Sequence, residues 1–84
     1  MKNFAVVRIC NKQDGTIAIP VSSFESETEA VKEYFRLCGL AVDSTHLTDA
    51  VTLLTKEGFE LRHECFEHEP QNQQQQQTPE PSGE

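Results

Sequence analysis

Short runs of β-branched and alternating residues near the amino terminus predict two strands. Residues 4–10 read Phe-Ala-Val-Val-Arg-Ile-Cys, a composition typical of a strand. The turn signal Asp14-Gly15 follows, and residues 16–21 alternate again. Because proline cannot donate a ladder hydrogen bond, we expect Pro20 at an edge, a bulge or a strand end. The two segments together predict a hairpin.

The middle of the chain shows helical spacing, which predicts two helices. Residues 26–29, Ser-Glu-Thr-Glu, fit a capping box, and the apolar positions that follow predict a helix over about 27–38 that ends at Gly39. Residues 43–45, Asp-Ser-Thr, offer a second N-cap, and Gly58 is expected to end that second helix. Its apolar stripe has i, i+3, i+4, i+7 spacing and consists of Leu47, Ala50, Val51 and Leu54.

The segment 59–66 then alternates as a third strand, with Glu60, Arg62 and Glu64 facing water. The predicted fold is therefore α+β, a two-layer β-β-α-α-β domain over residues 1–68 with a small antiparallel sheet and two helices on one face. We expect the third strand beside the first. An alternative stays open, in which 50–54 and 59–66 form a second hairpin around Lys-Glu-Gly at 56–58.

Composition separates this domain from the carboxy-terminal tail. Of the 84 residues, 14 are acidic and 7 are Lys or Arg, a net charge of −7. Residues 69–84 contain no aliphatic, aromatic or basic residue, include five consecutive glutamines and hold three of the glutamates, so a disordered Gln/Pro/Glu-rich tail is expected. The acidic balance disfavours a protein that binds nucleic acid by neutralising phosphates.

The lack of a recognisable targeting signal and the use of cysteine predict a cytoplasmic protein, either in a bacterium or in an infected host cell. There is no apolar run of about 18 residues for a membrane span, and no signal peptide pattern. Cys10, Cys38 and Cys65 are odd in number and widely spaced, which favours free thiols in a reducing compartment.

The strongest metal candidates are His63, Cys65 and His68, because imidazole and thiolate are preferred zinc ligands. On a strand, however, only the first two point the same way, and no Cys-x-x-Cys or His-x3-His spacing is present. We therefore expect no metal and no cofactor.

Catalytic residues are not expected either. A triad of Asp43, Ser44 and His46 can be imagined, but helix capping already explains the first two residues. Cys38 lies at a predicted helix C-terminus, the wrong end to stabilise a thiolate. We predict that the protein is not an enzyme.

A partner-binding surface is predicted on the side of the sheet away from the helices. The residues expected to make it are Arg62 and Phe66, with Phe4 and Arg8 beside them if the first and third strands pair. Basic and aromatic side chains on an exposed sheet can also bind single-stranded nucleic acid. Flanking glutamates make an ordinary ion-pair ladder the favoured interpretation.

Two resemblances accompany these patterns. Residues 51–61, Val-Thr-Leu-Leu-Thr-Lys-Glu-Gly-Phe-Glu-Leu, resemble the carboxy-terminal signature of small uncharacterised bacterial and phage domains, in which a helix runs into Gly-Trp-Glu-Leu and a final strand. Phe59 stands in the place of that tryptophan, and the resemblance implies a fold without an activity. The strand-turn-strand opening and acidic helix also resemble the small nonstructural protein of gokushovirus-type microviruses, which implies a role in DNA replication or packaging. The Gly-x-Phe-Asp ending of that family is missing.

The function expected is a small non-enzymatic binding or regulatory module of bacterial or phage origin that acts through protein contacts, including self-association through sheet edges. The alternative is a phage accessory protein in single-stranded DNA replication or packaging.

Overall fold

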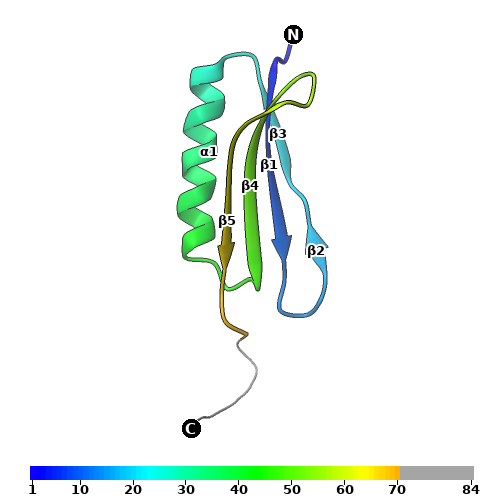
Figure 1. Cartoon of the computed structure of the whole chain (residues 1–84), viewed down its shortest axis with the longest axis vertical. Helices are drawn as coiled ribbons and strands as arrows, with labels where there is room; N and C mark the ends of the chain where they lie inside the picture. Colours follow the sequence, from blue (N-terminus) through cyan, green and yellow to red (C-terminus); the bar gives the residue numbers. More distant parts are fainter. Residues whose placement is uncertain (71–84) are drawn as a thin grey trace, which may run out of the picture.

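A single antiparallel sheet with one helix against it forms the architecture of the computed structural model, which describes residues 1–70 (Figure 1). The chain order is β1 (Phe4–Asn11), β2 (Ile17–Ala18), β3 (Val21–Phe24), α1 (Glu27–Val42), β4 (Thr48–Thr55) and β5 (Glu60–Glu67). The strand order across the sheet is β2-β1-β4-β5, and β3 pairs with the same strand as β2, namely β1. The segment predicted as a tail lies outside the described residues from position 71 onward.

The predicted second helix is wrong, and with it the β-β-α-α-β fold. Residues 48–55 form strand β4, which lies between β1 and β5 and pairs with both. The alternative hairpin around 56–58 is therefore correct. Asp49, Val51 and Leu53 are all fully buried at a period of two, and the β-branched residues of this segment favour a strand. The apolar positions of this segment fit both a helical stripe and a strand, so their spacing alone did not distinguish the two structures.

The expected pairing of the first and last strands is also wrong, because β4 separates them. The opening hairpin is confirmed: β1 pairs antiparallel with both β2 and β3. Pro20 lies between the latter two strands, where its carbonyl accepts a hydrogen bond from Arg8 N at 3.1 Å. That placement agrees with the expectation for a residue without an amide hydrogen.

The first helix is confirmed in position, but it is longer than predicted. Ser26 caps it, with its side chain accepting a hydrogen bond from Glu29 N at 3.4 Å. Gly39 does not end the helix, which continues to Val42. Ala41, in the added turn, is fully buried, and that burial offsets the ~1 kcal/mol that glycine costs in a helix interior.

The core lies between α1 and one face of the sheet. The sheet contributes Val6, Val51 and Leu53, and the helix contributes four buried residues, which are Ala30, Tyr34, Leu37 and Ala41. With these side chains packed, α1 covers one face of the sheet, and no helix or strand of residues 1–70 covers the other.

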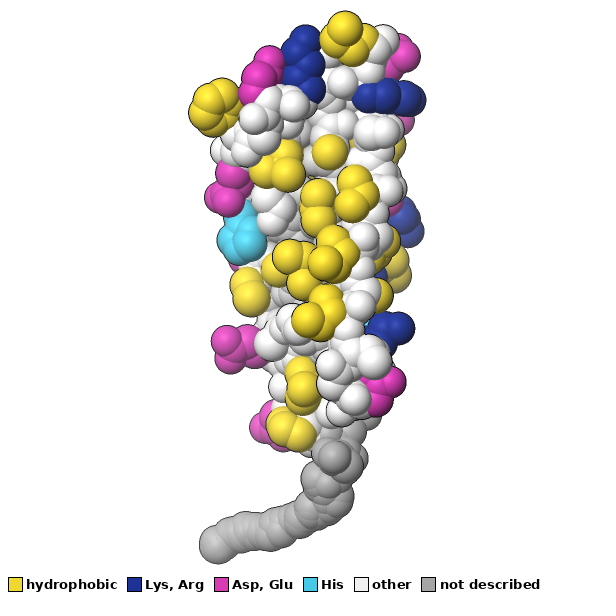
Figure 2. Space-filling view, turned by 90° about the vertical axis from the view of Figure 1, so that its right-hand side faces the viewer, with side chains coloured by type: hydrophobic (Ala, Val, Ile, Leu, Met, Phe, Trp, Pro, Cys, Tyr) yellow, Lys and Arg dark blue, Asp and Glu magenta, His cyan; other side chains and the backbone are white. Residues whose placement is uncertain are grey.

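The uncovered face of the sheet is apolar. Residues that alternate with the core positions face outward on it, and Figure 2 shows their apolar side chains gathered in a strip along the molecule. Ile9 is 38 % exposed and Val21 is 60 % exposed on this side. Within the described residues, no helix is long and apolar enough to span a bilayer.

Candidate functional site

The four residues expected to form a partner surface do not share one exposed face. Arg8 and Phe4 belong to β1, Arg62 and Phe66 belong to β5, and β4 lies between them. All four point to the helix side of the sheet, where Phe4 and Phe66 pack against the core. Arg62 alone is well exposed, with its guanidinium carbon 5.3 Å from the centre of the Phe35 ring.

Arg8 is withdrawn from the surface because it binds a buried carboxylate. Its side chain is 12 % exposed, and its Nη2 lies 3.0 Å from Oδ1 of Asp49, which is fully buried. Arg8 Nε donates to the same oxygen at 3.1 Å. The basic surface proposed for single-stranded DNA therefore loses one of its cations to an internal ion pair.

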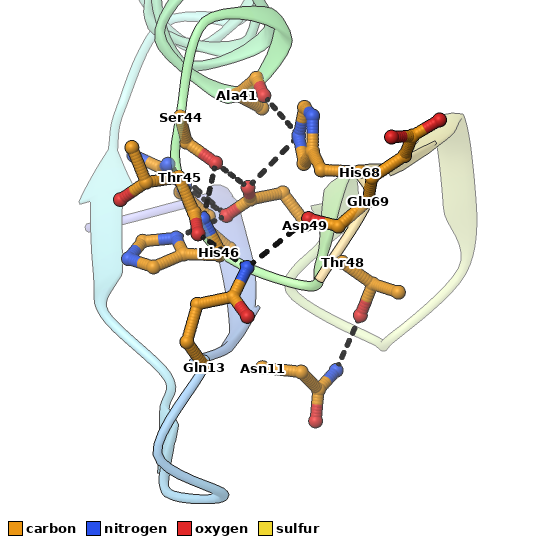
Figure 3. Close-up of polar contacts among 11 residues, drawn as sticks. Asn11, Gln13, Ala41, Ser44, Thr45, His46, Thr48, Asp49, His68 and Glu69 are labelled. Carbon is orange, nitrogen blue, oxygen red and sulfur yellow. Dashed lines mark hydrogen bonds and ion pairs between the residues drawn. The ribbon is translucent and has the colours of Figure 1, made fainter. Parts of the chain in front are cut away.

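Asp49 is the centre of a polar network at the end of the core nearest the α1–β4 connection (Figure 3). His46 Nδ1 lies 3.0 Å from Oδ1. On the other oxygen, Ser44 Oγ donates a hydrogen bond, and His68 Nε2 lies 3.6 Å away. His68 Nε2 also lies 2.8 Å from the Ala41 carbonyl oxygen. The network therefore joins the C-terminal end of α1 to β1, through Arg8, and to the residue that follows β5, His68.

Electrostatics keep this carboxylate ionised. Burial opposes the charge, but hydrogen bonds from Ser44, His46, Cys10 and Arg8 outweigh it and hold the pKa of Asp49 below its ordinary value. The pKa of the Cys10 thiol is raised by burial first and by its hydrogen bond to Asp49 second. A protonated, buried thiol is a poor nucleophile.

The imagined triad is only partly assembled. Ser44 and His46 do converge, but on Asp49 rather than on Asp43. Both side chains bind the carboxylate directly, so Ser44 Oγ has no hydrogen bond to an imidazole that could take its proton. Since residues 48–55 form strand β4, Asp43 is the C-cap of α1 instead of an N-cap.

The predicted zinc candidates are not brought together. His63 is exposed on β5, and its Nδ1 lies 2.8 Å from Thr52 Oγ1. Cys65 lies opposite Ala50, on the same outer face as His63. His68 instead belongs to the Asp49 network.

A different trio has metal-ligand types in proximity. One ligand atom each of Cys10, His46 and Asp49 lie within 4.8 Å of one another. However, Arg8 already neutralises the carboxylate and shares Oδ1 with His46. The geometry is therefore more consistent with a hydrogen-bonded network that stabilises this end of the core than with a cation site.

Sequence reasoning missed Asp49 because it placed residue 49 on a helix. One signal was present: the aspartate has the same period-two parity as Val51 and Leu53. An acid at a core position of a strand requires partners. The structure supplies two from the preceding connection, Ser44 and His46, and one from β1, Arg8, 41 positions away.

A second candidate site is the free edge of β5. Within residues 1–70, β5 pairs with β4 alone, and seven of its eight residues are exposed. His68 N donates to Leu47 O at 2.8 Å. Because hydrogen-bonded pairs alternate along an antiparallel ladder, the peptide groups of Arg62 and Glu64 point toward β4, and those of His63 and Cys65 point away from the sheet.

A groove runs between this edge strand and the helix. Phe35 is 56 % exposed beside it, despite being a large apolar side chain. The groove is lined from the helix by Tyr34, Phe35 and Cys38, and from β5 by Arg62, Glu64 and Phe66. Burial, followed by the effect of Cys38, raises the pKa of Tyr34 to about 12, so its hydroxyl stays neutral. The groove is thus apolar at its base and charged at its rim.

Comparisons with protein-family models, with curated proteins and with solved structures found no match.

Proposed function

We infer that this chain is a small non-enzymatic binding module that works through protein contacts, and that the contact surface is the free edge of β5. The observation that carries this inference is a full-length edge strand whose outward peptide groups border an apolar groove. An extended segment of a protein can add to such an edge as a further strand. Its alternate side chains would then enter the groove beside α1.

Two of the predicted contact residues take part in this surface. Arg62 and Phe66 line the groove, whereas Phe4 and Arg8 lie on the other side of β4. The alternative role in single-stranded DNA replication or packaging has less support, because Arg8 is ion-paired internally and Glu64 stands beside Arg62 at the same rim. A bacterial or phage source and a cytoplasmic location remain predictions.

The test compares two substitutions at Cys65. Cys65→Pro removes an outward amide without removing a β4 ladder bond, and Cys65→Ala keeps the amide. We expect proteins captured from source-cell extract, and any self-association, to be retained by Cys65→Ala and lost by Cys65→Pro. Circular dichroism and thermal melting check that both variants fold.

A second blocked-edge variant, Cys65→Lys, covers the case in which proline destabilises the strand, since an edge lysine disfavours further strand pairing. Equal capture and equal association state for wild-type, alanine and blocked-edge proteins would overturn the proposed function.

A further inference from the structure

We propose that the strand that adds to β5 is β5 of a second copy of this chain, paired antiparallel about a two-fold axis at His63. This inference rests on the proposed function, and it names the partner. It makes one continuous sheet from two molecules, with both helices on the same face. Its basis is the order of charges along β5 and the direction of the peptide groups.

The backbone directions restrict the possible registers. Only residues whose peptide groups point away from β4 can form the hydrogen-bonded pairs of a new antiparallel ladder. In the centre of β5 these are His63 and Cys65. A two-fold axis at His63 pairs this residue with its own copy and pairs Cys65 with Leu61 of the second copy. At His63 the outward groups therefore meet outward groups, whereas Leu61 lies at the register shift between β4 and β5, where the regular alternation ends.

The charges select among the registers that the backbone allows. With the axis at His63, Arg62 of each copy lies directly opposite Glu64 of the other, on the helix side of the sheet. These would be non-hydrogen-bonded pairs, in which side chains approach most closely. The dimer then contains two cross-strand ion pairs of opposite sign, and both residues are exposed in the single chain.

Neighbouring registers place like charges together. An axis at Glu64 sets that glutamate against its own copy, and an axis at Arg62 sets two guanidinium groups together. Like charges directly opposite one another destabilise a strand pair. An axis at Cys65 sets Glu64 against Phe66 and forms no pair of opposite charges, so among these registers only the axis at His63 places opposite charges directly opposite one another.

The apolar surface of α1 beside the groove also favours pairing of two β5 strands. Phe35 is 56 % exposed and Val42 is 55 % exposed, and both lie in the α1 stripe that includes Cys38, which lines the groove. Continuing the sheet beyond β5 extends the floor beneath this stripe with Arg62 and Glu64 of the second copy. Part of the apolar helix surface is then removed from water.

The first experiment uses charge reversal. Arg62→Glu and Glu64→Arg each convert both cross-strand pairs into like-charge pairs, and we expect each to raise the dissociation constant of the dimer by at least about tenfold. The double variant Arg62→Glu/Glu64→Arg restores opposite charges and should restore the dimer. A mixture of the two single variants should form the heterodimer. Sedimentation equilibrium at low salt over a broad range of concentration measures all four.

The second experiment fixes the register. In the proposed pairing the two His63 Cα atoms are about 5.5 Å apart, which a disulfide can bridge. The variant His63→Cys/Cys65→Ser should therefore form a disulfide-linked dimer under mild oxidation by copper phenanthroline. The wild-type Cys65 thiols are four residues out of register, about 13 Å apart, and should not cross-link.

Several results would overturn this inference. They are a wild-type chain that stays monomeric at about millimolar concentration, a dimer indifferent to both charge reversals, and oxidation that links Cys65 to its own copy in the wild type. A monomeric chain whose capture of another protein is still lost in Cys65→Pro refutes the self-pairing and leaves the proposed function standing.

Discussion

Replacing Asp49 by asparagine is the sharpest test of the buried network. The substitution keeps the shape of the side chain and removes its charge. Arg8, 12 % exposed, loses the anion 3.0 Å from its Nη2. Removing one partner of a buried ion pair costs about 3–5 kcal/mol. Because the asparagine carbonyl still accepts one neutral hydrogen bond, worth about 1 kcal/mol, we expect a loss of about 3 kcal/mol in the free energy of unfolding.

The loss depends on pH in a defined direction. The folded-state pKa of Asp49 is lowered, so its ionised form stabilises the fold fully above the ordinary aspartate pKa of about 3.9. That contribution disappears as the pH falls through the lower folded-state pKa. The stability gap between wild type and Asp49→Asn should therefore be constant near neutral pH and shrink below about pH 4.

Urea denaturation followed by far-UV circular dichroism measures the gap at each pH. Asp43→Asn is the matched control, because Asp43 is an exposed carboxylate at the helix C-cap. It should change stability by no more than about 0.5 kcal/mol. A loss below about 1 kcal/mol for Asp49→Asn at neutral pH, or a gap unchanged down to about pH 2, would show that the ionised carboxylate does not stabilise the fold.

Three further outcomes follow from packing and backbone geometry. Gly58 has φ +94°, so Gly58→Ala should destabilise the fold by about 1 kcal/mol, whereas Gly39→Ala, in open space within α1, should stabilise it by about 0.5–1 kcal/mol. Chemical denaturation measures the free energy of unfolding of both variants, and equal effects would contradict this prediction. Leu53→Ala, at a fully buried position, should cost about 2–5 kcal/mol in the same assay, and a loss under 1 kcal/mol would be too small. Exposed Cys65 should react with iodoacetamide well before buried Cys10, and mass spectrometry showing the reverse order would count against the burial described.

The correct and incorrect parts of the sequence-based fold have specific causes. The segments around β1, the opening hairpin and the capped start of α1 depend on local signals, namely β-branched runs, Asp-Gly and Ser-x-x-Glu. Such signals act within a few residues and survive in the fold. Residues 48–55 carry two compatible patterns, and the sheet selected the strand because β1 and β5 pair with it on both sides.

The candidate sites divide in a similar way. Arg62 and Phe66 were found because a charged and an aromatic residue stand in an alternating strand near the end of the domain. Asp49 was not found, because residue 49 was placed on a helix. Ser44 and His46 are its neighbours in sequence, whereas Arg8 and His68 reach it only in the folded sheet.

Local sequence patterns are sufficient to specify a small acidic α+β domain with a capped helix, an opening hairpin and an alternating last strand. Those features arise from local backbone preferences and from the periodicity of apolar residues. The position of residues 48–55 as a central strand is a property of the tertiary structure, because the two edges of this strand pair with β1 and β5, from opposite ends of the described chain. This arrangement buries Asp49 among its partners and leaves β5 at one edge of the sheet, where within residues 1–70 it pairs with β4 alone.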